Sequence, residues 1–80
     1  MKENITLKML SSIQNWLGHG VRIAFCTSEK DDFEVMKTID CVSFKNIEKV
    51  IMDTWKYKVF RIDTLNDLIC VYVVDMEETL

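Results

Sequence analysis

The stretch KVFRIDTLNDLICVYVV, residues 58–74, decides the fold, because it reads as two β-strands joined by a tight turn. Residues 58–64 and 69–74 are rich in β-branched and aromatic side chains, which favour strands. Between them stand Asn66 and Asp67, two residue types typical of turns. We therefore predict a β-hairpin in the C-terminal quarter of the chain.

The register of this hairpin assigns each side chain to one of its two faces. We expect Leu65 to lie opposite Leu68 across the turn. One face then pairs Phe60 with Val73, Ile62 with Val71 and Thr64 with Ile69. The other face pairs Val59 with Val74, Arg61 with Tyr72 and Asp63 with Cys70. Both faces carry apolar residues, so both need a cover.

Upstream of this hairpin the sequence predicts two helices and a second hairpin. Apolar residues recur every three or four positions in 4–17 and again in 44–55, the period of an amphipathic helix. Residues 21–27 and 33–40 instead alternate, as half-buried strands do. Lys37 falls on the apolar side of the latter strand, which indicates either a bulge or a position at the margin of the sheet.

The predicted order is helix, hairpin, helix, hairpin (αββαββ). We expect an α+β fold with a four-stranded antiparallel sheet and two helices packed on one face, because two layers are what 80 residues can fill. Residues 1–80 form a single small globular domain, whose acidic C-terminal tail, 75–80, is expected to fray. The predicted core consists of Ile13, Trp16, Phe25, Val35, Phe44, Ile51, Phe60, Ile62 and Val71.

Composition argues against several classes of protein. Cys26, Cys41 and Cys70 are an odd number of thiols with no close pair, which disfavours a secreted disulfide framework and predicts a cytoplasmic location. The longest apolar run, residues 68–74, is far shorter than a membrane span. The net charge of -3 and the scattered basic residues make nucleic-acid binding an unfavoured alternative.

No motif for catalysis or for a cofactor is found. The chain has no nucleophile elbow and no Cys-x-x-Cys pair, so we predict no catalytic residue and no enzyme. The three cysteines and His19 lack the close-pair spacing of zinc ligands, so no metal or other cofactor is predicted. Asp31 and Asp32 suit a weak site for a hard cation, but a solvated turn explains them equally well.

The leading hypothesis is a non-enzymatic protein-binding module that acts through a sheet face or a strand edge. Its partner is a larger protein or protein complex, or a second copy of the chain in a homodimer. A narrower version is an inhibitor, encoded by a phage or mobile element, of a host defence complex. The alternative structural reading places one helix on each face of the sheet and leaves no patch. The residues predicted to bind the partner are Val59, Arg61, Tyr72, Val74, Asp31 and Asp32.

Two other functions stay open at this point. The first is a small-ligand-binding or enzymatic domain with a cleft near His19 and Cys26. The second is weak nucleic-acid binding through Lys56, Lys58 and Arg61, which would fall steeply with salt.

Overall fold

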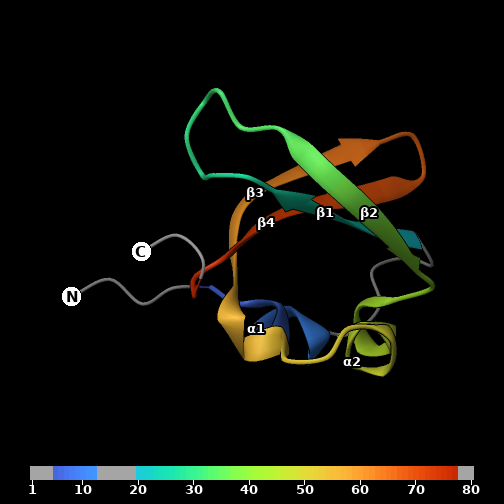
Figure 1. Cartoon of the computed structure of the whole chain (residues 1–80). Coiled ribbons are helices and arrows are strands. Elements are labelled where there is room, and N and C mark those ends of the chain that lie inside the picture. The colour runs from blue at the N-terminus through green and yellow to red at the C-terminus, as the bar shows by residue number, and fades with distance from the viewer. Residues whose placement is uncertain (1–4, 13–19, 78–80) are drawn as a thin grey trace.

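The computed structural model describes residues 5–12 and 20–77 (Figure 1). Two short helices lie below one face of a four-stranded sheet, so the fold belongs to the α+β class. The elements in chain order are α1 (Leu7–Ser11), β1 (Gly20–Cys26), β2 (Val35–Cys41), the 3-10 turn η1 (Phe44–Asn46), α2 (Ile47–Val50), the 3-10 turn η2 (Thr54–Lys56), β3 (Tyr57–Leu65) and β4 (Leu68–Asp75).

The sheet is mixed, so the prediction of a purely antiparallel sheet is wrong. The strand order is β2-β1-β4-β3; the two hairpins are antiparallel, but the central strands β1 and β4 run parallel. The cause is the connection from β2 to β3, which passes through the helix layer under the sheet (Figure 1). Such a crossover returns the chain to the end where β2 began, so β3 runs in the direction of β2 and β4 in that of β1.

A β-bulge in β3 divides the C-terminal hairpin into a part with the predicted register and a part without it. Residues 61–65 pair as predicted, with Leu65 opposite Leu68 and Arg61 opposite Tyr72. Beyond Arg61 the register shifts, and Val59 rather than Phe60 lies opposite Val73. The extra residue reverses the faces of Val59 and Phe60 relative to the prediction, because side chains alternate along a strand.

A second bulge lies in β2, an edge strand. Phe25 pairs with Lys37 and Cys26 with Val35, which leaves Met36 as the extra residue. Both readings of Lys37 therefore apply, since it stands beside a bulge and at the margin of the sheet. Val35, predicted to be core, is 46% exposed because no strand or helix among the described residues lies beyond this edge.

The helices are shorter than predicted. Within 4–17 the structure describes only α1, whose Leu7 and Leu10 are buried against the sheet; Ile13 and Trp16 lie outside the described residues. The predicted helix over 44–55 ends at Val50.

The break after α2 occurs at Ile51, whose backbone is extended, and is followed by Asp53 in the left-handed region at φ 58°. Ile51 is β-branched and lowers helix propensity, while its extended backbone lets its side chain reach the core. The turn leaves Met52 89% and Trp55 63% exposed. Trp55 is therefore not the core residue that a continuous helix would make it.

The apolar residues form two clusters, one on each side of the sheet. The helix face is the side that α1 and α2 cover, and its cluster consists of Leu7, Leu10, Val21, Ile23, Phe25, Cys41, Phe44, Ile47, Ile51, Val59, Ile69, Val71 and Val73. The opposite side, here called the aromatic face, buries Ala24, Cys26, Cys70 and Val74 beneath Phe33, Phe60 and Tyr72. Ile62, predicted to be core, is 49% exposed on the edge strand β3.

Candidate functional site

The aromatic face carries three partly exposed rings from three separate segments. Phe33 comes from the loop between β1 and β2, Phe60 from the bulge of β3, and Tyr72 from β4. The ring centroid of Phe33 lies 5.2 Å from that of Phe60 and 5.5 Å from that of Tyr72, both in edge-to-face geometry. No described helix packs on this side of the sheet (Figure 1), so the three rings are its main cover.

The loop that carries Phe33 is held in place at both ends. Thr27 and Glu34 close it, since the Thr27 amide donates to the Glu34 carbonyl at 2.9 Å and the Glu34 amide to Thr27 Oγ1 at 3.0 Å. Farther out, Lys58 Nζ donates to both carboxylate oxygens of Glu29 and ties the loop to β3. Because β4 lies between β1 and β3, the loop reaches across β4, and Phe33 contacts both of the other rings.

The floor under the rings is made of small, nearly inaccessible side chains. Ala24 and Val74 are each 1% exposed, and Cys26 and Cys70 are 3% and 4% exposed. Val74, predicted to touch a partner, is thus floor and not contact surface. Its partner in that prediction, Val59, is 8% exposed and lies on the helix face, because the β3 bulge moved it there.

Two ionisable groups on the aromatic face, Cys26 in the floor and Tyr72 above it, have a raised pKa that favours their neutral forms. Burial raises the pKa of the Cys26 thiol, whose Sγ donates to the Ala24 carbonyl. A hydrogen bond with Cys70, followed by burial, raises the pKa of Tyr72. Both groups therefore stay protonated at neutral pH, and a protonated thiol is a poor nucleophile.

Three ion pairs lie on the same side of the sheet as the rings. Arg61 lies 2.9 Å from Asp63, Arg22 2.8 Å from Asp40 and Lys58 3.0 Å from Glu29. The hydrogen bond with Arg22 lowers the pKa of Asp40 and raises that of Arg22 itself.

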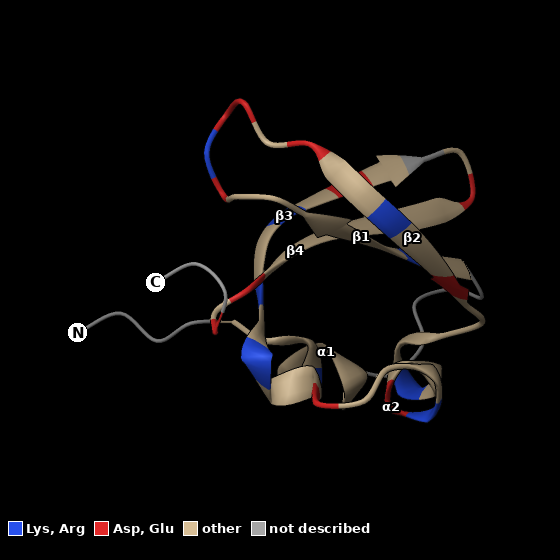
Figure 2. Ribbon diagram, in the orientation of Figure 1, with Lys and Arg blue, Asp and Glu red and all other residues tan. Residues whose placement is uncertain are grey.

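Arg61 also stacks on the aromatic centre, with its guanidinium carbon 5.7 Å from the Tyr72 ring centroid. The structure thus brings together Arg61 and Tyr72, as predicted from the cross-strand register. Asp31 and Asp32 are exposed on the loop that carries Phe33, where Figure 2 shows charged segments on the side of the sheet away from the helices. The sequence reasoning missed Phe33 and Phe60, since it took the first for a strand residue and the second for core.

The three basic residues of the nucleic-acid alternative do not form one free cluster. Lys58 and Arg61 are paired as described, and Lys56 Nζ lies 3.4 Å from an Asp75 carboxylate oxygen. The nearby Tyr57 phenol, followed by the hydrogen bond to Asp75, raises the pKa of Lys56. A backbone hydrogen bond joins the same two segments at the end of β4, since the Met76 amide donates to the Lys56 carbonyl.

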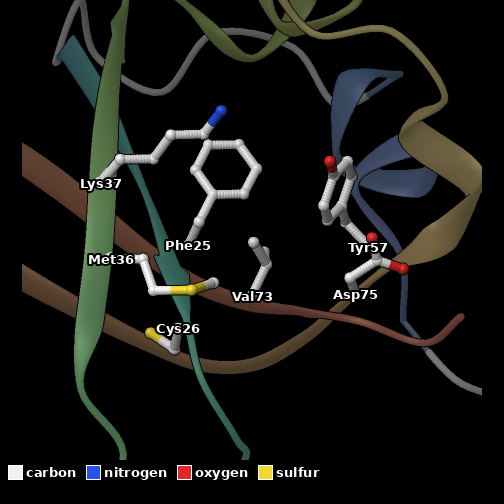
Figure 3. Close-up of a pocket in the computed structure, with 7 residues that line it drawn as sticks. All are labelled: Phe25, Cys26, Met36, Lys37, Tyr57, Val73 and Asp75. Carbon is white, nitrogen blue, oxygen red and sulfur yellow. The ribbon is translucent and has the colours of Figure 1, made fainter. Parts of the chain in front are cut away.

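A hollow of about 300 Å³ lies at the carboxyl end of β1 (Figure 3). Cys26 lines it together with Phe25, Met36, Lys37, Tyr57, Val73 and Asp75. The predicted cleft near His19 and Cys26 matches it only at Cys26. His19 lies outside the described residues and precedes the opposite end of β1, a strand that spans about 20 Å.

Other kinds of site are not found in the described part of the chain. No group of three or more potential metal ligands occurs among residues 5–12 and 20–77. Within the same ranges no helix has the length and apolarity needed to cross a bilayer. Comparison of the chain with models of protein families, with curated proteins and with solved structures found no match.

Proposed function

We propose that this protein is a small non-enzymatic binding module that docks another protein on its aromatic face. The observation that supports this is the cluster of Phe33, Phe60 and Tyr72 on the side of the sheet that no described helix covers. Aromatic residues and arginine are enriched where interfaces are most tightly bound. Here Arg61 stacks on Tyr72 at the edge of the cluster.

The surroundings of the cluster fit the anatomy of a protein interface. An apolar centre with a polar, solvent-exposed rim is the usual arrangement at such surfaces. The rim here consists of three ion pairs, and each sets a cation against a carboxylate. Because these pairs neutralise the cations, the face lacks the positive field that draws nucleic acid.

The charge around the face specifies the partner further. Asp31 and Asp32 stand beside the loop-borne Phe33 and add negative charge to a rim that is otherwise balanced. A partner with an apolar centre and a basic margin would complement this surface. A basic groove of a nucleic-acid-handling complex has such a margin, so the hypothesis of a phage-type inhibitor of host defence stays a prediction that rests on charge and size.

Surface variants in a binding experiment test this function. Tagged protein is incubated with lysate of its native host, and the captured species are identified by native mass spectrometry. We expect one larger protein to be held stoichiometrically by the wild type and by Trp55→Ala, a control on the helix layer. Tyr72→Ala should weaken that complex at least about tenfold, since loss of an interface aromatic commonly costs 1.4 kcal/mol or more. All variants are first checked for native circular dichroism.

Reversal of the loop charges tests the chemistry of the partner. The double variant Asp31→Lys/Asp32→Lys should slow association and weaken the salt dependence of binding.

In the capture experiment with the alanine variants, retention of the partner by Tyr72→Ala together with its loss in Trp55→Ala would move the site to the helix layer and refute the proposal. Recovery of a homodimer alone would make a second copy the occupant of the face.

A further inference from the structure

The hollow at the end of the helix face has the form of a small-molecule site. Its floor is Phe25 and Val73, which are 5% and 0% exposed, and Met36 and Tyr57 stand on opposite sides (Figure 3). The two helices lie under this face but leave the carboxyl ends of β1 and β4 open here. A volume of about 300 Å³ is at the lower end of the range for ligand pockets, so it suits a ligand of one or two rings.

Lys37 gives this hollow a positive charge that no carboxylate of the described residues pairs with. It extends from β2 over the Phe25 ring, with Nζ 5.0 Å from the ring centroid. It makes no ion pair with any carboxylate in residues 5–12 or 20–77. Across the hollow, Asp75 is engaged by Lys56, so its charge is already balanced.

The position of Lys37 is unusual for its strand. Its backbone pairs with Phe25, so its side chain is on the helix face, where its neighbours are apolar. The bulge at Met36 directly precedes it, and bulges often re-aim side chains beside binding sites. Lys37 is exposed, and a charged side chain on an edge strand also discourages pairing with other sheets, a role that differs from ligand binding.

We propose that this hollow binds a small aromatic carboxylate. The ligand's ring packs against Phe25 and Tyr57, whose own centroids lie 5.0 Å apart in edge-to-face geometry, and its carboxylate accepts a hydrogen bond from Lys37 Nζ. No covalent step is involved. The groups that contact the ligand, Phe25, Tyr57 and Lys37, belong to the helix face, and of the aromatic-face floor only Cys26 borders the hollow, so the inference goes beyond the proposed function.

The test is a titration of ¹⁵N-labelled full-length protein with indole-3-acetate and benzoate, followed by NMR. Indole-3-acetamide serves as the neutral match of the first probe. We expect saturable shifts of the Phe25, Met36 and Tyr57 amides with the acids, and affinity about tenfold lower for the amide, since a charge-assisted hydrogen bond is lost.

Two variants test whether Lys37 is the residue that binds the ligand's carboxylate. Lys37→Gln should lower the affinity for indole-3-acetate about tenfold, whereas Lys45→Gln, at an exposed position on η1, should leave it unchanged. The proposal is overturned if millimolar acid shifts no amide around the hollow, if acid and amide bind equally, or if Lys37→Gln binds as well as wild type. If Lys37→Gln self-associates and the wild type binds no acid, the role of this lysine is to prevent pairing of the edge strand β2 with other sheets.

Discussion

The two faces of the sheet bury their apolar side chains under different kinds of cover. On the helix face, regular segments that precede each hairpin supply the cover, and Ile23 and Val71 beneath them are 0% exposed. On the aromatic face, one loop and one bulge supply it, through Phe33 and Phe60. The floor is as inaccessible as the helix-side core, but the rings above it stay partly open to solvent.

This difference separates stability from recognition in a small chain. A side buried under helices can be filled tightly, which favours stability. A side covered only by rings keeps aromatic surface available to a partner. The β3 bulge makes this division, because without the extra residue Phe60 would face the helices and Val59 the solvent.

The largest effect on stability is expected when a lysine replaces Val59 or Phe60, the neighbouring residues that the β3 bulge places on opposite faces. Val59→Lys buries a charge on the helix face and should lower the free energy of unfolding by about 4 kcal/mol. Phe60→Lys sets its charge near solvent and should cost about 1–2 kcal/mol. Urea denaturation measures both. Equal losses, or a larger loss for Phe60→Lys, would contradict the assignment of faces.

Truncation of the helix-side core should come next. Ile23→Ala removes a fully buried side chain between β2 and β4 and should cost about 3 kcal/mol. Met52→Ala, at an 89% exposed position, is the matched control and should change stability by less than about 0.5 kcal/mol. A similar midpoint in urea for both variants would mean that the helix face is not the main core.

Removal of the loop-borne ring should have a smaller effect. Phe33→Ala breaks two edge-to-face contacts and should cost about 1–2 kcal/mol. It should also speed hydrogen exchange of the amides on the floor, Cys70 and Val74, because the loop no longer shields them. Val42→Ala, whose side chain is 77% exposed, is the control. Unchanged exchange on the floor would show that the loop does not cover this face.

The smallest effect on stability is expected from the side-chain hydrogen bonds that join α1 to α2. Glu48 of α2 accepts hydrogen bonds from Lys8 and Ser11, both at 2.6 Å, and these bonds, the one from Lys8 first, lower the pKa of Glu48. Because the folded pKa is the lower one, this contribution is present above the unfolded value of about 4.3 and is lost as pH falls through the folded pKa.

Glu48→Gln should therefore flatten the loss of stability below about pH 4.3, with little change at pH 2. Thermal unfolding of wild type and variant across this range measures it. Glu34→Gln, an exposed carboxylate outside the helix layer, is the control. The same acid dependence in Glu48→Gln and wild type would show that this contact contributes nothing.

Local patterns in the sequence were sufficient to find the strands. All boundaries were predicted within one residue except the start of β2, which lies two residues later than predicted, at Val35, and the turn was placed correctly at Asn66, which adopts φ 54°. Alternating patterns and turn residues are local signals, so they survive without knowledge of the rest of the chain.

Features that depend on distant parts of the chain were missed. The parallel pairing of β1 with β4 follows from the path of the crossover, which no alternation of residues encodes. The β3 bulge could not be recognised in the sequence, because Val59 and Phe60 are both apolar and either one suits the core. The end of α2 was missed because Ile51 satisfies helical spacing yet reaches the core from extended backbone.

Only part of the candidate site followed from the sequence. Arg61 and Tyr72 were found through the register, which holds near the turn. Phe33 was predicted to be the first residue of the alternating strand 33–40, whereas the hydrogen bonds of Thr27 with Glu34 place it in the loop. Lys37 was noticed as an exception to its pattern, and it marks the hollow proposed as a ligand site.

The central claim is that the bulge places Phe60 on the aromatic face beside the loop, and nuclear Overhauser contacts between aromatic protons test it most directly. We expect strong contacts from the Phe60 ring to the rings of Phe33 and Tyr72, whose centroids lie 5.2 and 6.3 Å away. Contacts from Phe60 to Val73 and the helix-side core, with Val59 contacting Val74 instead, would contradict the bulge and the division of faces that depends on it.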